Sequence, residues 1–114
     1  MHQARLILCT CPDEDCATEI ARTLVEERLA ACVSRLPGMT SVYRWDDEVQ
    51  NDQEILLLIK STDAVYGMLQ ARIEDLHPNE VPEIISLQVD QGLPSYLQWL
   101  RDHVAVSESD PSRS

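Results

Sequence analysis

The chain contains no phenylalanine, and aromatic residues make up only 4% of its 114 residues. Its core must therefore be aliphatic, built mainly from Leu, Ile, Val and Ala. Basic residues are also few, 9 against 20 acidic ones, which gives a formal net charge of −11. This charge repels phosphate backbones and anionic membrane surfaces, so the composition argues against a nucleic-acid-binding protein.

Long hydrophobic runs are missing as well. No segment approaches the length of a membrane span, and the apolar run at residues 6–9 is too short for the core of a signal peptide. The cysteines Cys9, Cys11, Cys16 and Cys32 all lie in the first third of the chain, which lacks the loop-rich character of a disulfide-stapled secreted protein. The sequence predicts reduced thiols in a cytoplasmic protein.

The hydrophobic pattern alternates between strand and helix periods. It predicts a strand at residues 5–11, a helix at 13–29, a long hairpin from 30 to 60, a second helix, a fourth strand and a terminal helix from Pro94. The hairpin is interrupted at Pro37-Gly38 and turns at Asp46-Asp47-Glu48, after which its second strand begins at Gln53. Ser61-Thr62-Asp63 is expected to cap the second helix, and His77 before Pro78 to stop it.

This βαββαβ order, followed by a C-terminal helix, predicts an α+β fold of the ferredoxin-like, split βαβ kind with an antiparallel sheet. We expect one domain at residues 1–106 and a disordered polar tail at 107–114. The strands at 5–11 and 53–60 are apolar on both faces, although helices cover only one face of such a sheet. The pattern therefore predicts self-association through the second face.

Several motifs, in the same order, resemble the CutA family of divalent-cation-tolerance proteins over nearly all of residues 6–104. They are Leu8-Cys9-Thr10 with Pro12-Asp13, Leu29-Ala30-Ala31-Cys32-Val33, Pro37-Gly38 with Ser41-Val42-Tyr43-Arg44-Trp45, Glu54 with Lys60-Ser61, His77-Pro78 with Val81-Pro82-Glu83-Ile84-Ile85, and Tyr96-Leu97-Gln98-Trp99-Leu100. The resemblance implies a ferredoxin-like homotrimer linked to tolerance of copper and other divalent cations. It also implies a copper site formed by Cys9, His77 and Glu83.

Two positions depart from the pattern of this family. Asn79 stands where the family often has a tyrosine, and Asp46-Asp47-Glu48 replaces a turn that commonly contains glycine. The first change puts an aromatic lining of the cleft beside His77 in doubt. The second is expected to alter the hairpin tip and to leave the rest of the fold unchanged.

A thiolate, an imidazole and a carboxylate suit copper or zinc, but each residue also has a structural alternative. Cys9 can be a small core residue. His77 can be a protonated cap of the helix C-terminus, paired with Glu80 or Glu83. Glu83 can simply face solvent.

Other residues leave further alternatives open. Cys16 lies in the first turn of a helix, which would lower its thiol pKa and make it the most reactive cysteine; with Cys11 it could hold a soft metal or merely pack. Tyr43, Trp45, Tyr96 and Trp99 can line a cleft or pack an interface.

The sequence has no glycine-rich phosphate loop and no Ser or Cys nucleophile beside a plausible base, so we expect no enzyme. Metal binding competes with a different class of function. In the alternative the trimer is a scaffold or signalling module whose inter-subunit clefts bind a small molecule or a protein partner.

Overall fold

The computed structural model describes residues 2–106. Within these residues the chain forms four strands and three α-helices in the following order: β1 (Ala4–Cys11), α1 (Glu14–Glu26), β2 (Cys32–Trp45), β3 (Glu48–Thr62), α2 (Tyr66–Leu76), β4 (Ile84–Gln88) and α3 (Pro94–Asp102). The strands form an antiparallel sheet in the order β2-β3-β1-β4. This is the predicted ferredoxin-like arrangement, with β1 and β3 at the centre of the sheet. The predicted tail at 107–114 lies outside the described residues.

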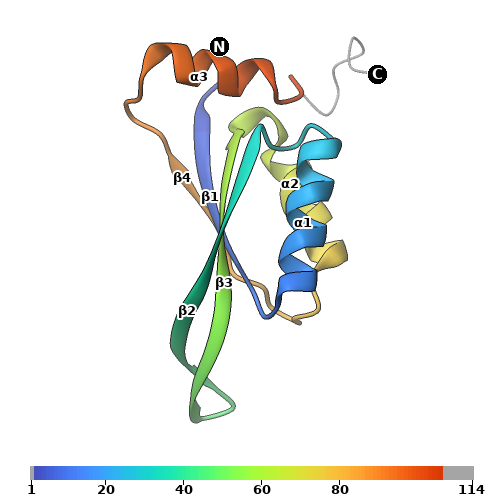
Figure 1. The fold of residues 1–114 in the computed structure, drawn as a ribbon, viewed down its shortest axis with the longest axis vertical. Coiled ribbons are helices and arrows are strands. Elements are labelled where there is room, and N and C mark those ends of the chain that lie inside the picture. Colours follow the sequence, from blue (N-terminus) through green and yellow to red (C-terminus); the bar gives the residue numbers. More distant parts are fainter. Residues whose placement is uncertain (1, 107–114) are drawn as a thin grey trace.

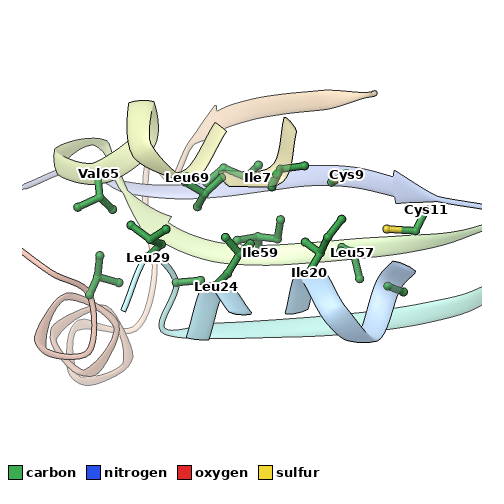
Figure 2. Packing of buried hydrophobic residues seen from close by; sticks show 14 of the residues in the cluster. Ile7, Cys9, Cys11, Ile20, Leu24, Leu29, Leu57, Ile59, Val65 and Leu69 are labelled. Carbon is green, nitrogen blue, oxygen red and sulfur yellow. The ribbon is translucent and has the colours of Figure 1, made fainter. Parts of the chain in front are cut away.

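Helices α1 and α2 lie side by side on one face of the sheet, and the β2-β3 hairpin extends well beyond them (Figure 1). The aliphatic core lies between these helices and the sheet (Figure 2). Alternate residues of the central strands, Ile7, Cys9, Leu57 and Ile59 among them, are fully buried there. Because successive side chains of a strand point to opposite faces, every second residue of these strands contributes to the core.

Helix α1 ends three residues earlier than the sequence predicted, at Glu26 rather than Leu29. Arg28 adopts a left-handed conformation, with φ of 61°. The amide of Leu29 then donates to the carbonyl of Leu24, and that of Arg28 to Val25, which is the Schellman pattern of helix termination. Because that position is usually glycine, the arginine here gave no stop signal in the sequence.

The predicted cap of α2 was wrong. Strand β3 continues to Thr62, a single 3-10 turn (Asp63–Val65) follows, and no side chain caps α2. The Ser61 hydroxyl instead donates to the Leu29 carbonyl at 2.6 Å, and Asp63 accepts from the Gln3 amide at 3.1 Å. These polar groups tie the end of β3 to neighbouring segments. The predicted end of α2 before His77 is confirmed.

The paired strands of the hairpin extend further than predicted because the turn between them is shorter. Asp46 and Asp47 both have positive φ, 52° and 62°, and the strands pair up to Trp45 and Glu48 on either side. Positive φ at both central residues is typical of the two-residue turns that match strand twist. The predicted bend at Pro37-Gly38 is confirmed as a shift in register between Leu36 and Met39.

The face of the sheet opposite α1 and α2 is apolar, as predicted. Directly paired residues in neighbouring strands point to the same face, so the pairing Leu58–Leu8–Ile85 forms one row across β3, β1 and β4. Leu56 lies in the row on one side, and Leu6 with Leu87 in the row on the other. We call this surface the open face; Ile85 and Leu87 remain 47% and 45% exposed in the single chain.

Candidate metal centre

The end of β1 places two thiols on the core side of the sheet. Cys9 and Cys11 are alternate residues of the strand, and both are fully buried. Thr10 lies between them, so its side chain points to the opposite face. His77, which follows the last residue of α2, is 7% exposed and reaches the same strand.

The hydrogen bonds of His77 fix the state of its ring. The backbone amide of Asn79 donates to Nδ1 at 3.1 Å, and Nε2 lies 2.7 Å from the backbone carbonyl of Thr10. A carbonyl can only accept, so Nε2 carries the hydrogen and Nδ1 is an unprotonated acceptor. The imidazole is therefore neutral, which corrects the alternative of a protonated cap paired with Glu80 or Glu83.

Three potential ligands meet at this point. The sulfur atoms of Cys9 and Cys11 and a ring nitrogen of His77 all lie within 4.8 Å of one another. Ligands at about 2.3 Å from a metal ion lie roughly 4 Å apart, so small side-chain movements would close this group on an ion. We call these three residues the thiol–imidazole cluster.

The structure brings Cys9 and His77 together, as the metal-site prediction requires, but adds Cys11 to them rather than Glu83. Glu83 is exposed and lines a cleft of about 620 Å³. The other residues lining the cleft are Thr10, Ser41, Val42, Tyr43, Trp45, Glu54, Asn79, Glu80 and Val81. Glu83 therefore faces an open cleft, whereas the thiols are buried.

The cleft has an aromatic wall despite the asparagine at position 79. Tyr43 and Trp45 supply it from the projecting hairpin, and the Tyr43 hydroxyl donates to the Asp52 carboxylate. This hydrogen bond raises the pKa of Tyr43. Tyr96 and Trp99 instead stack on each other on α3, with ring centroids 5.7 Å apart.

The sequence places Cys9 and Cys11 on one face of the strand, since residues two apart share a face, but the sequence prediction did not include Cys11 among the metal ligands with Cys9. Hydrogen bonding to Cys9, followed by burial, raises the pKa of the Cys11 thiol. Cys11 is therefore a protonated thiol near neutral pH unless a metal ion displaces its proton.

Cys16 is not the reactive cysteine that its place in the first turn of α1 suggested. It is 9% exposed, and burial, together with a hydrogen bond to Cys11, raises its pKa from 9.0 to about 12. Desolvation thus outweighs the effect of the helix N-terminus, where Asp13 already accepts the Cys16 amide at 2.8 Å.

The raised pKa of Cys16 makes stability depend on pH. Between pH 9 and about 12 the unfolded chain has lost the thiol proton while the folded chain keeps it. The unfolded state is favoured as pH rises, so the free energy of unfolding is expected to fall across this window. Urea unfolding of wild type and Cys16→Ala from pH 8 to 10.5 measures it: the decline should be shallower in the variant, and equal slopes would contradict the assignment.

The fold and the buried cluster define a small ferredoxin-like protein with potential soft-metal ligands at the end of its first strand. The chain belongs to the CutA1 divalent ion tolerance protein family, whose model matches residues 5–103. None of the helices at residues 2–106 has the length and apolar character needed to cross a membrane.

Relatives match over most of this chain. A divalent-cation tolerance protein CutA of Thermus thermophilus is 51% identical over 98 residues, which cover 86% of this chain and 95% of that protein. The human protein CutA is 46% identical over 101 residues, or 89% of this chain, but these cover only 56% of its own length. The structure of CutA1 from Oryza sativa superposes with a TM-score of 0.90 at 34% identity, covering 93% of this chain and 97% of that one.

Proposed function

We propose that this protein acts in divalent-cation tolerance as a non-catalytic, cytoplasmic homotrimer that binds a metal ion at the end of β1. Copper is the first candidate ion and zinc the second. The observation that carries the proposal is the meeting of Cys9 and His77 in a buried position, with their ligand atoms within 4.8 Å. The names of the relatives, which refer to divalent-cation tolerance, support the same class of function.

The chemistry of the cluster favours copper or zinc over calcium or magnesium. Sulfur and imidazole ligands select these softer ions, whereas calcium and magnesium require oxygen ligands. A net charge of −11 also raises the local concentration of cations around the molecule. Glu83 in the adjacent cleft would supply an oxygen ligand only after a rearrangement that brings it to the thiols.

The state of the nucleophile candidates supports the non-catalytic part of this proposal. Cys11 lies beside the neutral imidazole of His77, which resembles a nucleophile with its base. It is fully buried, however, and its pKa is raised rather than lowered. A reactive cysteine needs the opposite environment.

Trimer formation is supported by the open face. An apolar sheet face of this extent is rarely left in water by a monomeric protein, and helices α1 and α2 lie on the opposite face (Figure 1). Three copies of the chain arranged around a common axis would remove it from solvent. Light scattering of the purified protein measures the mass directly, and a stable single chain at micromolar concentration would overturn this part of the proposal.

The metal site is tested with reduced protein titrated with copper and with zinc by calorimetry. Cys9→Ser and His77→Ala are each expected to weaken binding by about 10- to 100-fold, since outer-shell partners alone cost that much. Glu83→Gln measures the contribution of the cleft carboxylate. Unchanged affinity in both Cys9→Ser and His77→Ala would contradict a metal site at these residues.

A second candidate function rests on the cleft. Its volume of about 620 Å³ and its aromatic wall of Tyr43 and Trp45 suit a small-molecule ligand in a scaffold or signalling trimer. Fractionated metabolites would then raise the melting temperature of wild type but not of Trp45→Ala, and chelators would have no effect. A stabilising effect of added metal alone would favour the first function instead.

A further inference from the structure

Cys11 is the unexplained member of the cluster. It does not belong to the Cys9, His77 and Glu83 set, yet its sulfur lies within 4.8 Å of the ligand atoms of both Cys9 and His77. It is fully buried and forms no disulfide. Two adjacent thiols facing one imidazole change the kind of cation that the site prefers.

The two sulfur atoms are freer to bind a cation than the imidazole is. The Cys9 thiol makes a long contact, 3.9 Å, to the Thr10 carbonyl, and its other hydrogen bond is to Cys11, which belongs to the same cluster. Both nitrogens of His77 are in use: binding through Nδ1 would displace the Asn79 amide, and binding through Nε2 would displace the Thr10 carbonyl. Either displacement leaves a backbone group at the cluster unpaired, so the histidine is the costly ligand.

Coordination number then separates the candidate ions. Zinc in proteins takes four ligands, and the cluster offers three, one of them at a cost. Soft thiolate ligands select Cu(I), which is satisfied by two or three of them. Harder cations need oxygen ligands, and the Thr10 carbonyl at the cluster is already occupied by His77.

We propose that Cys9 and Cys11 together bind a soft monovalent cation, Cu(I) or its analogue Ag(I), with His77 as an additional ligand. Binding forms a metal–sulfur bond at each thiol that becomes a thiolate, and the proton of that thiol passes to solvent. The copper enters already reduced, so no electron is transferred. The inference rests on the proposed metal-binding function and specifies its cation.

The experiment uses the full, reduced chain under anaerobic conditions. Cu(I) is supplied as its complex with bicinchoninate, and transfer of the ion to the protein is followed by loss of the chelator colour. Wild type is expected to take up one cation per chain. Cys11→Ala and Cys9→Ala are each expected to weaken uptake by at least about 100-fold, which is the upper end of the effect of outer-shell changes.

Cys32→Ala is the matched control. It also removes one thiol, but Cys32 is paired with Lys60 in the sheet register, on the open face rather than the core face. Its affinity should equal that of wild type. Equal losses in Cys11→Ala and Cys32→Ala, or no loss in Cys11→Ala, would overturn the proposal.

X-ray absorption of the Cu(I)-loaded wild type keeps the test decisive if a variant does not fold. Two sulfur neighbours around copper are expected, and a single sulfur neighbour would contradict the role of Cys11. Zinc titration separates this inference from the proposed function. If Cys9→Ala abolishes zinc binding while Cys11→Ala leaves both zinc and Cu(I) unchanged, the metal-binding function stands and the monovalent site falls.

Discussion

Ile85→Glu is expected to separate the proposed trimer into single chains. Ile85 lies in the middle row of the open face, opposite Leu8, which in turn pairs with Leu58. A carboxylate at this point of a closed interface would lose its hydration without gaining a partner, and such burial costs several kcal/mol per charge. A symmetric trimer carries the change in every subunit, so the cost is incurred three times over.

The matched control for this variant is Val25→Glu. Val25 is 43% exposed and Ile85 is 47% exposed, so the two changes add the same charge to equally accessible apolar positions. Val25 belongs to α1, on the other side of the sheet, and its variant should keep the wild-type mass. Size-exclusion chromatography with light scattering gives the masses. A trimeric Ile85→Glu, or equal dissociation of both variants, would contradict assembly through the open face.

Leu57→Ala is expected to cause the largest loss of stability from a single truncation. Leu57 is fully buried beneath the helices and is paired with Cys9 of β1 and Arg35 of β2. Removing a buried leucine side chain to alanine costs roughly 2–5 kcal/mol, from lost burial and from the cavity that remains. That is a large share of the roughly 5–15 kcal/mol by which domains are stable.

Urea unfolding at one fixed protein concentration measures this loss, because the stability of an oligomer depends on concentration. Leu93→Ala provides the comparison, since Leu93 is 69% exposed and the same atoms are removed. Its effect should stay within about 0.5 kcal/mol. A loss below about 1 kcal/mol for Leu57→Ala would mean that the core collapses around the deletion.

The order of elements, the two-faced apolar strands and the bend at Pro37-Gly38 could be predicted from the sequence because each depends on local pattern. The end of α1 could not be predicted, because Arg28 adopts the left-handed conformation that glycine usually adopts at a helix C-terminus. The cap of α2 was mispredicted because Ser61 and Asp63 bond to Leu29 and Gln3, which are distant in sequence. Propensity carries no information about such partners.

The candidate metal site could likewise be predicted only in part from the sequence. The family motifs identified Cys9 and His77, and the structure places them together. The neutral state of His77 depends on the Thr10 carbonyl and the Asn79 amide, which only the fold brings to the ring. Asn79 contributes its backbone to this arrangement, so the departure from tyrosine at that position leaves the histidine held in place.

The tight hairpin turn at Asp46 and Asp47 has a consequence for the evolution of the cleft. Side chains on a paired strand alternate between its faces, so inserting one residue between Asp46 and Asp47 while β3 stays in place would slip β2 by one position. Tyr43 and Trp45 would then turn to the opposite face of the strand and Arg44 would turn to theirs, so the cleft would gain a guanidinium where it now has rings. The ligand preference of the cleft can thus change through turn length alone, without any amino-acid substitution in β2.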